Sequence, residues 1–264
     1  MQFHVPILTY HSQNIAGHAT ADNDHVAFAA DLEQLHGDGW RFISLDTLLD
    51  CLDGSGVAPG KSLCLTFDDG CDFDARDIDY PGFGVQRSFL GIMRDFVARH
   101  GPSEQPGLQA TSFVIASGEA RGIIDQKSLF GKGWISDDWW GEDPLIGIGN
   151  HGWDHNHPDL GPERGGFSGI STMAQCERQV EEAATEIEQR CGTRPAFFAY
   201  PFGESSEFIR EHYFPKFTHR HRCRAALGTE PGHVTAESNR WNLPRYVCGR
   251  DWKSPHELLS LVGD

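Results

Sequence analysis

Short apolar runs alternate with amphipathic segments along the chain. The runs at residues 6–11 (PILTYH), 62–67 (SLCLTF) and 110–115 (ATSFVI) have the length and the β-branched or aromatic content of buried strands. Further strands are expected at 41–45, 145–150, 195–203, 224–228 and 243–249. Apolar residues at three- and four-residue steps predict helices at 25–40, 46–54, 87–101, 171–192 and 254–263.

This alternation of strands and helices predicts an α/β fold. About seven strand-plus-helix units can be recognised, one short of a complete eight-fold barrel, so we expect a distorted, incomplete (β/α)7-type barrel. No repeat or linker divides the chain, which predicts one domain over residues 1–264. Two segments without a clear period, 70–88 and 117–144, are expected to be inserted loops, the second with short helical pieces.

Charge, hydropathy and cysteine content indicate which partners and which cellular compartment to expect. The formal net charge of -16 would repel a phosphate backbone, so nucleic acid is not expected as a partner. No apolar stretch reaches 18 residues, so no membrane span is expected. The 7 cysteines lack CxxC spacing and predict reduced thiols. No signal peptide is recognisable, which suggests a cytoplasmic protein unless a leader has been lost; the pattern does not indicate the oligomeric state.

The strand expected at 62–67 ends on two adjacent carboxylates, Asp68 and Asp69, followed by Gly70. Asp-Asp-Gly is a common turn, because Asp bonds its own backbone and Gly supplies positive φ. The alternative is chemical, since active sites of α/β sheets and barrels lie where strands end. Adjacent residues point in different directions, so one carboxylate can hold a metal while the other takes a proton.

Candidate partners lie in NHGWDHNHPDL, which contains His151, His155 and His157. A histidine at a strand end and another four residues later can bring two imidazoles to one cation, although solvated loop histidines are the simpler alternative. Together with Asp-Asp-Gly, the pair favours a metal site. Two histidines and one aspartate leave open positions, as a catalytic metal requires for water and substrate.

TFDDG (66–70), GNHGWDH (149–155) and FFAYPFG (197–203) resemble the polysaccharide deacetylase family, the carbohydrate esterase 4 or NodB-homology group. The resemblance covers roughly residues 5–255 and implies a NodB-like domain. By position it implies one divalent ion, most often Zn2+, bound by Asp69, His151 and His155. It also implies that Asp68 is the catalytic base and that the backbone N–H of Phe202 is an oxyanion donor.

The sequence departs from the family pattern in two catalytic motifs. Many members have an arginine that orients the base at the position of Ala199; Arg245, at another strand end, either replaces it or is structural. The usual C-terminal Leu-x-His is missing, and His256 lies at an expected helix start. The N-terminal LTYHS resembles instead a circularly permuted subgroup that acts on poly-N-acetylglucosamine and related glycans. That resemblance makes His11 the general acid, with a packed histidine as the alternative.

Two further features of the sequence leave alternatives open. The family often has Pro directly after the second histidine, but HNHP inserts two residues; the spacing favours His155 as the ligand, and the following PDL favours His157. Three tryptophans, Trp134, Trp139 and Trp140, either stack on sugar faces or pack in the core.

These residues predict a metal-dependent hydrolase that removes N-acetyl or another small acyl group from an amino sugar or glycan. One alternative is hydrolysis of another C–N amide bond, in a formyl-sugar or a ureide. An inactive glycan-binding relative and a two-His-one-carboxylate Fe(II) oxygenase are the other classes considered. The missing leader favours a soluble or cytosolic-face substrate.

Overall fold

The computed structural model describes residues 4–157, 160–161 and 165–263. Its main feature is a nine-stranded sheet whose central strands are parallel neighbours. These strands are, in order across the sheet, β1 (Val5–Tyr10), β3 (Ser62–Phe67), β6 (Ala110–Val114), β7 (Ile146–Asn150), β8 (Phe197–Ala199) and β9 (Ala225–Leu227). The remaining strands are β2 (Arg41–Phe42) beside β3, β11 (Tyr246–Val247) parallel to β1, and β10 (His233–Val234) antiparallel to β1.

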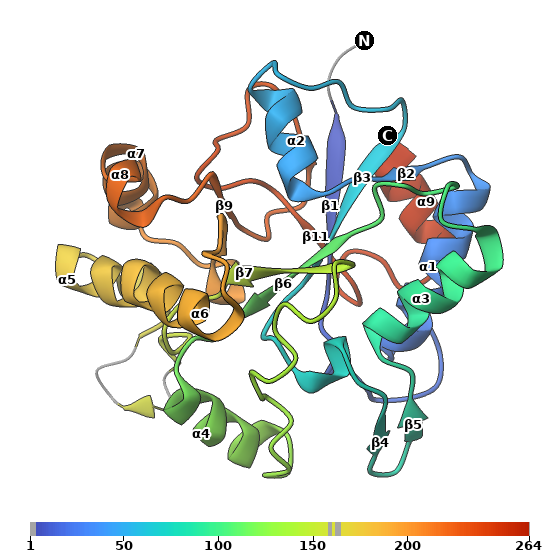
Figure 1. The fold of residues 1–264 in the computed structure, drawn as a ribbon, viewed down its shortest axis with the longest axis horizontal. Helices are drawn as coiled ribbons and strands as arrows, with labels where there is room; N and C mark the ends of the chain where they lie inside the picture. Colours follow the sequence, from blue (N-terminus) through green and yellow to red (C-terminus); the bar gives the residue numbers. More distant parts are fainter. Residues whose placement is uncertain (1–3, 158–159, 162–164, 264) are drawn as a thin grey trace.

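Helices surround this curled sheet (Figure 1). They are α1 (Asp24–Gly37), α2 (Leu45–Leu52), α3 (Phe89–His100), α4 (Gly118–Ser128), α5 (Met173–Cys176), α6 (Ala183–Cys191), α7 (Phe214–Lys216), α8 (Thr218–His221) and α9 (Pro255–Gly263). The predicted distorted, incomplete barrel is confirmed. Within the ranges that the structure describes, every helix is too short or too polar to cross a membrane.

The central strands are covered on both faces, as parallel strands require. All 6 residues of β1 and all 6 of β3 are buried. Under α1 and α3, the rings of Phe28, Phe67 and Phe89 meet with centroids 4.5 to 5.4 Å apart. This packing fixes the strands, so the residues just beyond their carboxyl ends lie on a rigid edge.

Some of the expected elements differ from those observed. The strand predicted at 41–45 stops at Phe42, because Ser44 accepts a hydrogen bond from the N–H of Thr47 and begins α2. The segment 70–88, expected to be a loop, contains a short antiparallel hairpin of β4 (Ile78–Tyr80) and β5 (Gly84–Gln86).

The segment 117–144, expected to be a loop with short helical pieces, begins with the helix α4 at residues 118–128. The inner face of α4 is polar, which conceals the helical period. Buried Asp125 accepts hydrogen bonds from the N–H groups of Gly133 and Trp134, both at 2.9 Å. Buried Arg121 donates to the carbonyl of Ile135 at 3.0 Å. These bonds tie the following loop to the helix.

The predicted helix at 171–192 is confirmed, with a capping box at Thr172 and a left-handed cap at Gly192. Its regular geometry is interrupted between α5 and α6 by a π-helical stretch, Glu177–Glu182. Such interruptions are frequent at functional sites. This one lies against the loop that carries the predicted histidines.

Candidate active site

Asp68 and Asp69 follow β3, which lies between β1 and β6. The chain turns sharply there, with positive φ at Asp69 (76°) and at Gly70 (67°). A Cβ atom at position 70 would lie 2.7 Å from Cγ1 of Val114, so only glycine fits. The turn is therefore real, as the simpler sequence interpretation held, but it also presents two carboxylates at the sheet edge.

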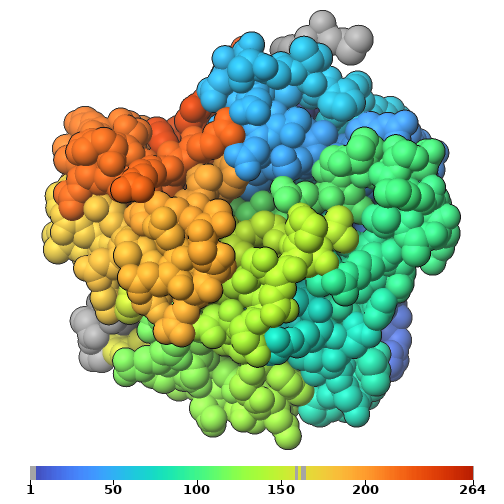
Figure 2. All heavy atoms as spheres, viewed as in Figure 1, coloured from blue at the N-terminus to red at the C-terminus, as the bar shows by residue number. Residues whose placement is uncertain are grey.

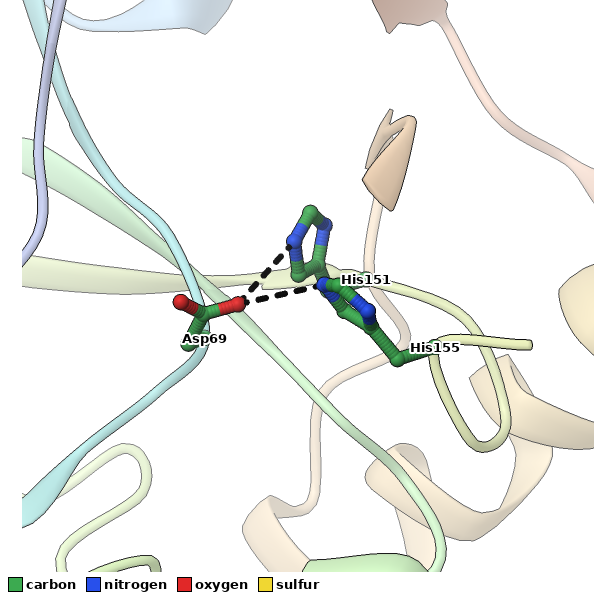
Figure 3. A group of neighbouring side chains, drawn as sticks. All are labelled: Asp69, His151 and His155. Atoms are coloured by element: carbon green, nitrogen blue, oxygen red, sulfur yellow. Dashed lines mark ion pairs between the residues drawn. The ribbon is translucent and has the colours of Figure 1, made fainter. Parts of the chain in front are cut away.

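The structure brings Asp69, His151 and His155 together (Figure 3). His151 follows the end of β7, and His155 lies four residues further along the same loop. Nε2 of His151 lies 3.5 Å and Nε2 of His155 3.3 Å from Oδ1 of Asp69. Donors bound to one zinc ion at about 2.0–2.1 Å with tetrahedral angles would be about 3.3 Å apart, so this N,N,O set fits a divalent ion.

The neighbours of these side chains hold them in a suitable orientation. Nδ1 of His151 hydrogen-bonds the carbonyl of Ala199 at 2.9 Å, which leaves the lone pair of Nε2 facing Asp69. Gln13 donates from Nε2 to Oδ2 of Asp69, so Oδ1 is left for the histidines. Sγ of Cys71 is 3.6 Å from Oε1 of Gln13 and directs the amide. Sequence reasoning missed Gln13, although it lies two residues after His11.

The π-helical stretch anchors the loop of residues 151–157, which we call the histidine loop. Asn150 donates from Nδ2 to the carbonyl of Val180 at 2.9 Å, and its Oδ1 accepts from the N–H of Gly152. Gln179 accepts from the N–H of Trp153 at 3.0 Å and donates to Asp154 at 2.7 Å. His155 itself has a φ of 61°. A strained backbone at this residue is retained because the surrounding hydrogen bonds determine the loop.

Asp68 is paired with Arg245, although the two lie far apart in the sequence. Nη1 and Nη2 of Arg245 donate to the two carboxylate oxygens at 2.7 and 2.8 Å. Nε of Arg245 donates to the carbonyl of Gly228 at 2.8 Å, which fixes the guanidinium plane. Both side chains are buried. Arg245 therefore contacts the predicted base directly, while Ala199 contributes only its carbonyl.

The charges at the site influence one another. Burial raises the pKa of Asp68, but Arg245 and then His151 overcome this and hold that pKa below its usual value. Burial likewise raises the pKa of Asp69, and its contacts with His151 and His155 hold it well below its usual value. Burial lowers the pKa of His151, yet the carboxylates of Asp68 and Asp69 raise it overall. Both aspartates are thus charged near neutral pH.

A cavity of about 220 Å³ opens onto these groups. Its walls include His11, Asp68, Phe202 and the three side chains that could hold a metal, Asp69, His151 and His155. Nδ1 of His11 is buried and has no hydrogen-bond partner among the described residues. Phe202 has a φ of 58° at the turn after β8, and its side chain is 58% exposed. The predicted base, acid and oxyanion donor therefore face one cavity.

Other sequence candidates lie elsewhere. His157 does not belong to the group of Asp69, His151 and His155. Its ring centroid is 5.9 Å from that of His155. Pro158 and Asp159, which entered the spacing argument, lie outside the described residues. His256 is exposed on α9. Trp139 and Trp140 are buried in the core and are not free to stack on a sugar, whereas Trp134 is partly exposed.

Comparisons with known proteins bear on this arrangement. Residues 104–213 match the family model described as polysaccharide deacetylase. This part contains His151, His155 and Phe202, whereas Asp68 and Asp69 precede it. The predicted resemblance to the polysaccharide deacetylases is confirmed. Membership of the subgroup with an N-terminal Tyr-His motif stays a prediction. No curated protein gives a significant match.

Solved deacetylases share the fold over nearly the whole chain. The Streptococcus pyogenes deacetylase PplD, solved with acetate, is 18% identical over 99% of each chain, with a TM-score of 0.69. A de-N-acetylase from Aggregatibacter actinomycetemcomitans is 10% identical over 98% of this chain and 100% of its own, with a TM-score of 0.65. IcaB from Ammonifex degensii is 15% identical over 99% and 100%, with a TM-score of 0.59. At these identities the likeness establishes the polysaccharide deacetylase fold.

Proposed function

We propose that the protein is a metal-dependent hydrolase that removes N-acetyl or another small acyl group from an amino sugar or glycan. The observation that carries this proposal is the meeting of the Asp69, His151 and His155 group with the Arg245-bound Asp68 at one cavity. The family match and the shared fold support the same class of reaction. Both comparisons favour a deacetylase over the Fe(II) oxygenase and leave the sugar and the acyl group open.

Asp69, His151 and His155 would hold the divalent ion, which we take to be zinc. The chemistry that the ion supplies is polarisation of the acyl carbonyl and a lowered pKa of the attacking water. The charge of Asp69 and the orientation of Nε2 in His151 suit this role, because the ligands must be deprotonated and aimed at one point.

The remaining steps fall to the side chains around the cavity. Asp68, charged and held by Arg245, accepts the proton of the attacking water. The backbone N–H of Phe202 donates to the oxygen that becomes negative in the transition state. An amine is a poor leaving group without a proton, and His11 faces the same cavity and supplies one. The free sugar amine and the carboxylate then leave.

The test measures metal content and product release in the same preparations. Zinc-loaded protein is expected to release acetate from N-acetylglucosamine oligomers, and metal-stripped protein is not. The Asp69→Ala and His151→Ala variants should lose bound metal, whereas His157→Ala should keep it. Asp68→Asn should keep both fold and metal but lose turnover by about 100- to 10,000-fold.

Two results would overturn the proposal. Full metal occupancy in both ligand variants would mean that the ion binds elsewhere. Near-normal turnover by Asp68→Asn would remove Asp68 from the reaction. Mass spectrometry of formylated sugars and ureides, incubated in parallel, separates the proposed reaction from hydrolysis of other C–N bonds.

A further inference from the structure

A second cavity, of about 180 Å³, lies beside the first. Asp69, His155 and Phe202 line both cavities, so the two meet at the metal-site residues. One wall of the second cavity is aliphatic and is made by Ile115, Ile124, Leu129 and Ile135. The cavity is also lined by Gln13, Cys71, Ser128 and His157.

The wall of this second cavity is built by α4 and the loop that follows it. Leu129 and Ile135 are 3% and 6% exposed and belong to a small apolar core with Phe73 and Tyr80 from the 70–88 segment. Figure 2 shows these two stretches, green and teal, side by side at the lower edge of the molecule. The bonds from Asp125 and Arg121 to the loop backbone fix the wall, so the cavity is pre-formed.

The geometry of a secondary amide indicates which part of the substrate enters which cavity. Such an amide is planar and trans, so its acyl chain and its N-substituent point in opposite directions across the C–N bond. His11, which would protonate the leaving amine, lines the first cavity and not the second, so the amine and its sugar would lie in the first cavity. The acyl chain then extends past His155 and Phe202 towards the second cavity.

We propose that the second cavity binds the acyl group and that the preferred substrates are amino sugars with N-acyl chains longer than acetyl. This inference rests on the proposed deacylation. One water needs about 15 Å³ of comparable space, so the methyl group of acetyl would leave most of the cavity unfilled. The aliphatic wall also suits a hydrocarbon chain better than a sugar ring, whose hydroxyls would lose hydrogen bonds against that wall.

The proposal is tested by varying the length of the N-acyl chain. The kcat/KM values for N-acetyl, N-propionyl, N-butyryl and N-hexanoyl glucosamine are compared on the zinc-loaded protein. Burial of each added methylene is worth about a fourfold increase, so the values should rise at least as far as butyryl. A parallel titration with acetate, propionate, butyrate and hexanoate, followed by calorimetry, measures the same preference without turnover.

Variants that fill the second cavity test whether this cavity causes the preference for longer acyl chains. Ile124→Trp should fill the cavity and abolish the gain with chain length. Ile123→Trp changes the neighbouring residue, which does not line the cavity, and should keep the gain. Ile135→Phe provides a second filled variant should Ile124→Trp fail to fold, which thermal unfolding will show.

The outcomes separate the two proposals. A preference for longer carboxylates that disappears in the filled variants supports the acyl cavity even if no N-acyl sugar is hydrolysed, in which case only the proposed function fails. Equal affinity for all four carboxylates overturns the inference. So does a filled variant that loses every acyl substrate equally through a raised KM, since the cavity would then bind the sugar.

Discussion

The guanidinium of Arg245 forms a two-point ion pair with the carboxylate of Asp68, at 2.7 and 2.8 Å, in the interior of the protein. Neither side chain is more than 5% exposed. The pair joins β11 and the segment before it to the end of β3, two parts of the chain that the sequence separates by 177 positions.

We predict that Arg245→Met lowers the free energy of unfolding by about 3–5 kcal/mol, because it leaves a buried carboxylate unpaired. Asp68→Leu with Arg245→Met should cost less than the two single changes together. Chemical denaturation of the metal-free proteins measures all three.

The matched control for this prediction is Arg224→Met. Arg224 pairs with Asp46 and Asp50 on the surface, where its side chain is 30% exposed, so the loss should be below about 1 kcal/mol. Equal destabilisation by the two arginine variants would contradict the prediction.

Gln13 should affect metal affinity rather than the fold. It donates to Oδ2 of Asp69, the oxygen that does not face the histidines. Loss of a hydrogen-bond partner of a metal ligand typically lowers metal affinity about 10- to 100-fold. Gln13→Leu should therefore weaken zinc binding in a competition titration with a chelator. Gln109→Leu serves as the control, because Gln109 bonds the carbonyl of Pro144 away from the site. Unchanged affinity in Gln13→Leu would show that Asp69 is held without it.

The strands that carry the site could be predicted because their signals are local. β1 and β3 are short, mainly apolar runs, and the polar residues that end them lie at the same sheet edge in any parallel arrangement. The grouping of Asp69 with His151 and His155 followed from that rule together with the family resemblance.

Other features could not be predicted because their cause is tertiary. Gln13 and Asp69 are separated by 56 positions, and nothing in the sequence around Gln13 indicates their contact. The helix α4 buries Arg121 and Asp125, whose bonds to a later loop replace the apolar stripe by which a helix is recognised. The hairpin β4–β5 lies in a segment rich in glycine and aspartate, where strand propensity is low.

His11 is predicted to serve the leaving group. His11→Ala should lower turnover of an N-acetyl sugar far more than turnover of an aryl acetate, whose phenolate leaves without a proton. Release of acetate and of phenolate is followed in the same preparation. His256→Ala, at the exposed start of α9, should leave both rates unchanged. Equal losses on both substrates in His11→Ala would mean that His11 positions the substrate instead.

Asp74 should make the stability of the metal-free protein depend on pH. Its carboxyl accepts a hydrogen bond from Ser112 at 2.6 Å, and burial raises its pKa from 3.8 to about 7, with the charges of Asp69 and Asp68 adding to the effect. A proton bound in the folded state but not in the unfolded state stabilises the fold at low pH. This stabilisation is present below about pH 4 and is lost as the pH rises to about 7.

The expected loss from Asp74 across that interval is of the order of 4 kcal/mol, at about 1.4 kcal/mol per pH unit. Asp74→Asn keeps the acceptor for Ser112 and removes the ionisable group, so its unfolding free energy should fall less between pH 4 and pH 7. Urea denaturation at several pH values compares the two proteins. Identical pH profiles would show that Asp74 is charged in the folded state.

Because of the π-helical stretch at 177–182, the number of residues in this helix matters as much as their identity. Its extra residue lets Val180 and Gln179 contact the histidine loop while Ala183, Ala184 and Ile187 still face the core. Deleting one residue would restore a regular helix but rotate everything after it by about 100°. Either the histidine loop or the apolar face would then lose its contacts. Relatives that differ in length by a single residue here should therefore hold the histidine loop by other means.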